Sequence, residues 1–161
     1  MIRNSTIQDV DQILIIYQHA KKYMLENNNP YQWTNNYPSY ELIIEDIKQQ
    51  NSYVYEIDNK ILAVFYFKIG TDHTYNQIKG QWLNNKPYGV IHRIAVLTNK
   101  KGIAKQCLDY CLNQCPNIKI DTHQANIPMQ KFLLKNNFKY CGIIYLDNQE
   151  ERLAYQYMEE L

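Results

Sequence analysis

Hydrophobic positions recur with a helical period along the first fifty residues of the chain. After Asp9, which suits a helix N-cap, apolar residues follow every three or four positions and predict a helix over about residues 9–26. The polar segment "ENNNPYQW" ends this helix. A second helix is predicted from Ser39 to about Gln50, because Pro38 precedes it and an apolar stripe lies beside a charged one.

The period then changes from helical to strand-like. "SYVYEI" and "ILAVFYFKI" are β-rich runs joined by "DNK", and this spacing predicts a hairpin. Strands are also predicted for "YGVIHRIAVL", "NIKIDT", "KYCGIIYL" and "RLAYQYM", and helices for residues 102–114 and 127–135. Residues 70–87 contain Gly, Asn and Pro with little periodicity, so we expect a loop or an irregular strand that borders a site.

This order of elements predicts an α+β fold of the three-layer type, in which helices cover both faces of a mixed sheet. A length of 161 residues suits a single domain spanning residues 1–161. The apolar fraction of 45% and the charged fraction of 20% are those of an ordinary globular chain, so nothing indicates global disorder.

Charge narrows the classes of partner. Seventeen basic and sixteen acidic residues give a net charge of +1, and no basic block is longer than a pair, which argues against binding to nucleic acid or to a membrane surface. The polar N-terminus and the lack of an apolar run of about 18 residues argue against a signal peptide and a spanning helix. We therefore expect a cytoplasmic monomer or homodimer with a small-molecule or peptide partner.

Three of the four cysteines recur every fourth residue, at Cys107, Cys111 and Cys115. On a helix this spacing places them along one face, whereas a zinc knuckle favours C-x-x-C. Cys141 lies in a separate apolar segment. We expect all four to be reduced packing residues, and we expect no metal site.

The glycines, at positions 70, 80, 89, 102 and 142, exclude both G-x-G-x-x-G and the P-loop. The remaining candidate is "NKKGIAKQ", at the junction of a predicted strand and helix. Gly102 lets the backbone approach a ligand, Ala104 keeps that approach open, and the first amides of the helix lack intrahelical partners. With nearby lysines this combination suits a diphosphate. A solvated helix N-terminus with a loop glycine is the alternative.

Together with its context, this loop resembles that of the GNAT superfamily of acyl-CoA-dependent N-acetyltransferases. In that family a strand similar to "HRIAV" precedes a loop that reads R/Q-x-x-G-x-G/A, and here Asn99 stands in place of Arg or Gln. The segment 120–155 resembles a bacterial subgroup of unassigned GNAT proteins, with D-T-H, N-x-x-M-Q, C-G-x-I-Y and R-x-A-Y elements. Asn137 replaces the usual glycine before Phe138, and asparagine tolerates the positive φ of a helix-ending turn.

The resemblance implies a mostly antiparallel sheet in which two parallel strands, 88–97 and 118–122, splay apart to admit the pantetheine of acetyl-CoA. The implied cofactor-binding residues are Ile94, Ala95, Val96, Lys100, Lys101, Gly102, Ile103, Ala104, Lys105, Asn126, Met129, Phe132 and Lys135. A strand amide would stabilise the oxyanion while the amine attacks the thioester directly. For Asn126, Met129 and Phe132, helix capping and core packing are the alternative roles.

An ammonium group must lose a proton before it can attack, so a base is expected near the splay. The candidates are Asp121, His123 and His92. Strand alternation places Asp121 and His123 on one face, and it aligns His92 with Ile94 and Val96. The alternatives are a turn cap for Asp121 and hydrogen-bonded polar roles for the histidines.

The family often protonates the leaving thiolate with a Tyr seven residues after the motif Asn, but this chain has Leu133 there. Tyr140, Tyr145 or solvent would have to replace it.

Five aromatic residues lie in segments that wall the acceptor site in this family: Tyr31, Trp33, Tyr37, Trp82 and Tyr88. They would form an aromatic acceptor pocket, or they pack in the core. The resemblance thus implies an acetyl-CoA-dependent N-acetyltransferase that acts on a primary amine of a small molecule or peptide. An acyl-CoA-binding sensor without turnover, or a structural domain that binds no CoA, is the alternative.

Overall fold

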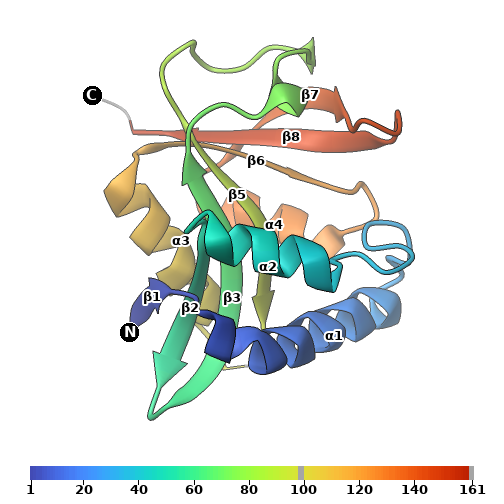
Figure 1. Ribbon diagram of the computed structural model, residues 1–161. Helices are drawn as coiled ribbons and strands as arrows, with labels where there is room; N and C mark the ends of the chain where they lie inside the picture. Colours follow the sequence, from blue (N-terminus) through green and yellow to red (C-terminus); the bar gives the residue numbers. More distant parts are fainter. Residues whose placement is uncertain (98–99, 160–161) are drawn as a thin grey trace.

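In a computed structural model that describes residues 1–97 and 100–159, the chain forms one eight-stranded sheet with helices on both faces (Figure 1). The strands are β1 (Ile2–Asn4), β2 (Ser52–Ile57), β3 (Lys60–Ile69), β4 (Lys79–Gly80), β5 (Gly89–Val96), β6 (Asn117–Thr122), β7 (Lys139–Tyr145) and β8 (Glu151–Met158). The helices are α1 (Val10–Glu26), α2 (Tyr40–Lys48), α3 (Ile103–Gln114) and α4 (Ile127–Lys135), with 3-10 turns η1 (Ile7–Asp9) and η2 (His73–Tyr75). The strand order is β1-β2-β3-β5-β6-β8-β7-β4, and the pair β5–β6 is parallel while the other pairs are antiparallel. The predicted fold class is therefore confirmed.

The predicted helices and the longer strands are confirmed, with small shifts at their ends. The Ser39 hydroxyl accepts a hydrogen bond from the Leu42 amide at 3.1 Å and so caps α2, which ends at Lys48 rather than Gln50. Two strands, β1 and β4, were not predicted. They span three and two residues, which is too short for a period-two pattern to show.

Two hydrophobic clusters lie on opposite faces of the sheet. Helices α1 and α2 pack on one face around Ile13, Ile16 and Ile43, and α3 and α4 pack on the other around Leu108 and Leu133 (Figure 1). We call the second group the α3–α4 cluster; it consists of Tyr55, Ala63, Phe65, Phe67, Ile91, Ile103, Cys107, Leu108, Cys111, Cys115, Ile118, Ile120, Leu133, Phe138 and Tyr155.

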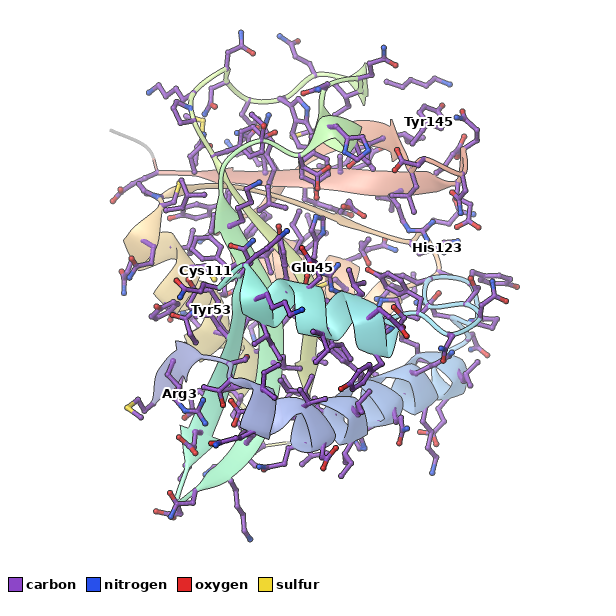
Figure 2. All side chains as sticks on the ribbon, in the orientation of Figure 1. Arg3, Glu45, Tyr53, Cys111, His123 and Tyr145 are labelled. Carbon is purple, nitrogen blue, oxygen red and sulfur yellow. The ribbon has the colours of Figure 1, made fainter. Side chains whose placement is uncertain are left out.

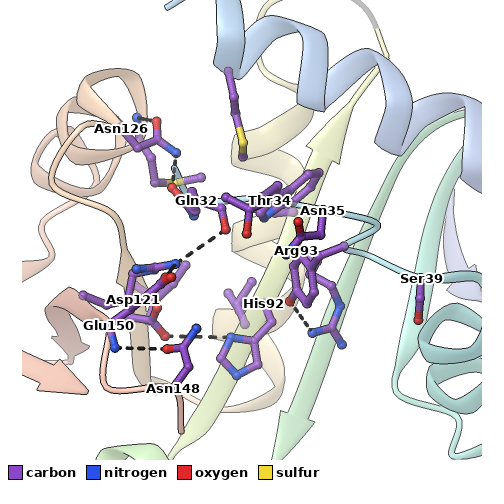
Figure 3. A pocket seen from close by; sticks show the side chains of 18 of the residues that line it. Gln32, Thr34, Asn35, Ser39, His92, Arg93, Asp121, Asn126, Asn148 and Glu150 are labelled. Carbon is purple, nitrogen blue, oxygen red and sulfur yellow. Dashed lines mark hydrogen bonds and ion pairs between the residues drawn. The ribbon is translucent and has the colours of Figure 1, made fainter. Parts of the chain in front are cut away.

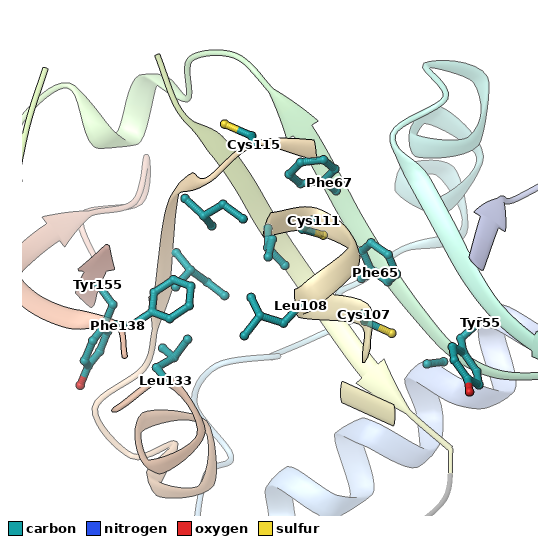
Figure 4. Close-up of a cluster of buried hydrophobic side chains, with 14 of the residues drawn as sticks. Tyr55, Phe65, Phe67, Cys107, Leu108, Cys111, Cys115, Leu133, Phe138 and Tyr155 are labelled. Atoms are coloured by element: carbon teal, nitrogen blue, oxygen red, sulfur yellow. The ribbon is translucent and has the colours of Figure 1, made fainter. Parts of the chain in front are cut away.

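The helical cysteines are packing residues, as predicted. Cys107 and Cys111 on α3, and Cys115 just after it, are buried free thiols within the α3–α4 cluster (Figure 4). Burial raises the pKa of Cys107 to about 12, which disfavours the thiolate needed for metal binding or nucleophilic attack.

Strand β1 is fixed by an ion-pair network centred on Arg3, which is labelled in Figure 2. Its guanidinium donates to both carboxylate oxygens of Asp9, at 2.8 and 3.0 Å, and its Nε donates to Glu56 at 3.0 Å. Asp9 also accepts the Thr6 amide at 2.7 Å. The hydrogen bonds from Arg3 hold the pKa of the buried Asp9 carboxyl below its usual value, although burial opposes this.

We expect Asp9→Asn to lower the free energy of unfolding by about 2 kcal/mol at pH 7, because it removes charged hydrogen bonds to Arg3. A carboxyl whose pKa is depressed by folding stabilises the fold above its unfolded pKa, and this contribution is lost as the pH falls through the folded value. The difference in free energy of unfolding between the wild type and the variant should therefore shrink below about pH 4. Urea denaturation at pH 7 and pH 3 measures this difference. The exposed Asp11→Asn is the control, and a deficit that does not change with pH would contradict the assignment.

Candidate functional site

Strands β5 and β6 lie side by side where they begin and separate toward their ends. Their parallel pairing is limited to Gly89 with Ile118 and Val90 with Lys119. Among the described residues, no ladder partner faces the later part of β5 on the β6 side. This is the splayed pair that the family resemblance implied, and it leaves backbone N–H and C=O groups available to a ligand.

A β-bulge interrupts β5 at the splay. Val64 pairs with Ala95 and Tyr66 pairs with His92, so two residues of β5 lie opposite a single residue of β3. Arg93, within the bulge, has a φ of 51°. The bulge therefore changes which face each later residue of β5 points to.

One prediction about side-chain direction is wrong for this reason. Ile91 belongs to the α3–α4 cluster, so alternation places its neighbour His92 on the opposite face. After the bulge, Ile94 and Val96 again pack against the α3–α4 cluster, and Ala95 joins the α1–α2 side. His92 is thus not aligned with Ile94 and Val96.

A cavity of about 420 Å³ opens between the splayed strands and the segment 31–39 (Figure 3). We call it the polar cavity; its lining includes Gln32, Trp33, Asn35, Tyr37, His92, Arg93, Asp121, Asn126, Asn148, Glu150 and Arg152. Arg93 pairs with Asp46 at 2.7 Å, and Arg152 pairs with Glu150 at 3.2 Å. Asp121 has no guanidinium partner among the described residues, so its carboxylate gives this wall a site for a cation.

A second cavity, of about 280 Å³, lies between α1, β5 and α4. We call it the apolar cavity. Seven of the predicted cofactor residues line it: Ile94, Ala95, Val96, Ala104, Asn126, Met129 and Phe132. Met24, Ile94, Asn126 and Met129 line both cavities. The two cavities therefore meet at the splay.

His92 is held between two carboxylates. Its Nε2 lies 2.8 Å from Asp72 Oδ2, and its Nδ1 lies 3.9 Å from Asp121 Oδ2. Burial disfavours ionisation of Asp72, but hydrogen bonds from His92 and Thr74 outweigh it and hold the pKa of this carboxyl well below its usual range. Because a carboxylate only accepts, the hydrogen bond to Asp72 requires a proton on Nε2, and Nδ1 is the ring nitrogen on the side of Asp121. Figure 3 shows His92 and Asp121 facing one another.

His123 lies apart from these groups. It lines a different cavity, of about 290 Å³, and its ring stacks on that of Tyr31 with centroids 5.3 Å apart. Its Nδ1 accepts the amide of Ala125 at 2.9 Å, and burial, followed by the charge of Arg152, lowers the pKa of His123. Of the three candidate bases, the structure thus brings together His92 and Asp121.

Gly102 lies at the start of a helix that follows a strand, as the sequence indicated. Gly102 has a φ of 92°, in the left-handed region, and occupies the N-cap of α3 without a side chain to cap it. Ile103 is buried in the core, so its backbone alone is available to a ligand. Lys105 pairs with Asp109 at 2.9 Å, and Asn99 lies outside the described residues. Lys100 and Lys101 belong to this loop and line neither cavity.

Helix α4 begins and ends as the sequence indicates. Asn126 Oδ1 accepts the Met129 amide at 3.2 Å, so the residue caps the helix while it lines both cavities. Asn137 has a φ of 67°, and the Phe138 amide donates to Leu133 O at 3.0 Å, which confirms the expected helix-ending turn. Lys135 is exposed near that end and lines neither cavity, so the structure does not bring it to the predicted cofactor residues.

The five aromatic candidates are divided between different places. Trp33 and Tyr37 line the polar cavity, and Tyr31 lines the cavity of His123. Trp82 and Tyr88 line neither, because they pack on Lys119, whose Nζ lies 4.3 and 4.0 Å from their ring centroids. Of the two roles left open for these rings, Trp82 and Tyr88 take core packing, and they do not wall the same pocket as Trp33.

Some residues of the site were not identified as site residues from the sequence. Gln32 Oε1 accepts from Asn126 Nδ2 at 2.9 Å and from Thr122 Oγ1 at 3.2 Å, and so ties the segment 31–39 to β6 and α4. Asp72 and Tyr75 lie in the segment expected to border a site, but neither was singled out. The sequence did hold one signal for an ordered turn here. Asp72 and Thr74 have the spacing at which an Asp side chain accepts a hydrogen bond from the backbone two residues later.

The described part of the chain holds no group of three or more His, Cys, Asp or Glu side chains arranged for a metal ion. None of its helices combines the length and the apolar character needed to cross a bilayer.

No protein-family model matches the chain, and no curated protein matches its sequence. Solved structures do. A GNAT-family acetyltransferase from Streptococcus agalactiae is 29% identical with a TM-score of 0.88, and the match covers 100% of this chain and 96% of that one. A putative acetyltransferase from Staphylococcus aureus is 28% identical with a TM-score of 0.71, and 97% of each chain is covered.

A ribosomal-protein-alanine N-acetyltransferase from Brucella melitensis is 14% identical with a TM-score of 0.66 and 99% of each chain covered, so that likeness concerns the fold alone. The Streptococcus agalactiae and Staphylococcus aureus proteins support acetyltransferase activity in general. The chain has the fold of the GNAT acetyltransferases, and its structural neighbours support its place in that superfamily.

Proposed function

We propose that this protein is an acetyl-CoA-dependent N-acetyltransferase that acts on a primary amine of a small molecule or peptide in the cytoplasm. The observation that carries this proposal is the junction of the two cavities at the splay. Predicted cofactor residues line the apolar cavity, and His92 and Asp121 face the polar cavity on the other side of the shared residues.

The residues present fit coenzyme A. Asn29 lines the apolar cavity, and its buried Oδ1 has no hydrogen-bond partner among the described residues, so an amide N–H of a ligand would satisfy it. A Cβ at Gly102 would meet nothing within 4 Å, so the space outside the first amides of α3 is open. When bound, acetyl-CoA would supply an activated acetyl group. The backbone of residues 94–96 and the loop 100–105, together with Asn126, Met129 and Phe132, would hold it.

The polar cavity can prepare an amine for attack. Asp121 would accept a hydrogen bond from the ammonium group and orient it, and His92 Nδ1 would take the proton that the nitrogen must lose. Unpaired N–H groups of β5 beyond Val90 would donate to the oxygen on which charge develops. Trp33 and Tyr37 would bound the acceptor on the side of the segment 31–39. No covalent enzyme intermediate is required.

One observation favours a second candidate, an acyl-CoA-binding sensor without turnover. Leu133 stands where the family often has a Tyr that protonates the leaving thiolate. Its side chain is completely buried in the α3–α4 cluster. Tyr140 and Tyr145 line neither cavity. A thiolate would then leave into solvent, or it would not be released at all.

Calorimetry with acetyl-CoA, followed by an amine panel with detection of the released thiol, separates these functions. Binding with acceptor-dependent thiol release supports the enzyme. Binding without release supports the sensor, and no binding contradicts both.

We expect Gly102→Val to weaken acetyl-CoA binding about tenfold, because left-handed backbone costs a residue with a Cβ about 1–2 kcal/mol and the loop would change shape. Gly70→Val is the matched control, since Gly70 also has a positive φ, of 154°, but lies outside both cavities. Equal loss of affinity in the two variants would contradict a role for the loop.

A further inference from the structure

We propose that one short turn, residues 72–75, positions both candidate catalytic groups: Asp72 fixes the tautomer of His92, and Tyr75 fixes the carboxylate of Asp121. This inference rests on the proposed function, in which His92 is the base. The two strands that carry His92 and Asp121 separate at the site, so neither strand can align the other's side chain. A single element that contacts both side chains would supply this alignment.

Asp72 is built to hold His92 in one orientation. Its Oδ1 accepts from the Thr74 amide at 2.9 Å and from the Thr74 hydroxyl at 2.6 Å, so the carboxylate cannot rotate freely. Its Oδ2 is thereby directed at His92 Nε2, 2.8 Å away. Because the ionised carboxylate can only accept, it keeps the proton on Nε2 and leaves Nδ1 as the basic nitrogen.

Tyr75 holds the side chain of Asp121, on strand β6, in one orientation. Its ring is almost completely buried, and its hydroxyl donates to Asp121 Oδ2 at 2.6 Å. Burial, followed by the charge of Asp121, raises the pKa of Tyr75 well above its usual value, so the phenol remains a donor. The other oxygen of Asp121 has no hydrogen-bond partner among the described residues, which leaves it for an incoming ammonium group.

The turn itself is anchored by the aromatic residues that do not line the cavity. The Asp72 amide donates to the Tyr88 hydroxyl at 3.0 Å, and Trp82 Nε1 donates to Tyr75 O at 2.9 Å. Trp82 and Tyr88 are in turn packed on Lys119 of β6. These contacts give the two rings a supporting role and explain how a loop segment can hold two side chains with the precision that catalysis requires.

The first test does not depend on activity. With four histidines in the chain, the imidazole nitrogen resonances of His92 can be assigned by comparison with His92→Gln. We expect the neutral ring to carry its proton on Nε2 in the wild-type protein and, at least partly, on Nδ1 in Asp72→Asn, because the Asn amide can donate to Nε2. A wild-type ring protonated on Nδ1, or a tautomer that Asp72→Asn leaves unchanged, would overturn the inference.

The second test is kinetic. We expect Asp72→Asn to lower kcat about 10²–10⁴-fold with little change in the KM of the amine. The reason is that a His92 ring in the wrong tautomer cannot act as the base. Asp72→Asn should add no further loss to His92→Gln, because the two residues act as a unit. Likewise Tyr75→Phe should reduce kcat in the wild-type background but not in Asp121→Asn.

The control in the same turn is His73→Ala. Its side chain is 71% exposed and contacts Asp147 rather than either candidate group, so kcat should stay unchanged. Losses that add independently in the double variants, or an equal loss in His73→Ala, would indicate a merely structural turn and overturn the inference. A wild-type protein that acetylates no amine would contradict the proposed function, and the nitrogen resonances of His92 would still decide the role of Asp72.

Discussion

Replacement of His92 by glutamine is expected to lower kcat about 10²–10⁴-fold while the affinity for acetyl-CoA remains unchanged. His92 lines the polar cavity but not the apolar cavity, so its loss removes the acceptor of the amine's proton without altering the residues proposed to hold the cofactor. Glutamine retains a side chain that can hydrogen-bond Asp72, which limits structural damage. Steady-state kinetics with an acceptor found in the amine panel measures kcat, and calorimetry measures binding.

His123→Gln is the matched control for this experiment. Both histidines were candidate bases, but His123 lines a different cavity and its Nδ1 is occupied by the amide of Ala125. We expect little change in kcat for this variant. A large loss in His123→Gln together with an active His92→Gln would move the base to His123 and contradict the assignment made here.

Local patterns predicted most of the fold. The helical period defined α1, α2 and α4. Capping of α4 by Asn126 was one of two roles left open, and the turn at Asn137 was implied by the family resemblance. The place of Gly102 at a strand-to-helix junction was also predicted, and its φ of 92° is one that glycine adopts without strain. Seven of the residues implied by the family resemblance do line one cavity.

What the sequence could not predict is non-local. The bulge at Arg93 inverts the direction of the side chains that follow it, and no period within β5 signals this, because its register depends on pairing with β3. Gln32 contacts Asn126 across more than ninety positions. Asp72 and Tyr75 lie in an aperiodic segment, where only tertiary contacts reveal their roles.

The second large effect concerns the bulge. We expect Arg93→Met to lower the free energy of unfolding by about 3–5 kcal/mol, because it leaves the buried carboxylate of Asp46 without its guanidinium partner. The side chains of Arg93 and Asp46 are each only 9% exposed, and the Arg93 Nη2 lies 2.7 Å from Asp46 Oδ2. Methionine is also unbranched at Cβ, so the backbone at φ 51° carries no new strain. The variant also loses the hydrogen bond from Arg93 to the Tyr37 hydroxyl, of 3.1 Å, which is exposed and contributes less. Urea denaturation measures the loss of stability.

The double variant Arg93→Met, Asp46→Leu separates the ion pair from the packing around it. With no charge left behind, it should recover most of the lost stability. The loss of stability in Arg93→Met should also shrink as the pH falls. Burial raises the pKa of Asp46, and protonation of this carboxylate removes the uncompensated charge. A double variant as unstable as Arg93→Met would contradict this account. If the double variant is stable but its kcat is reduced, the ion pair serves chiefly to hold the bulge, and with it His92, at the polar cavity.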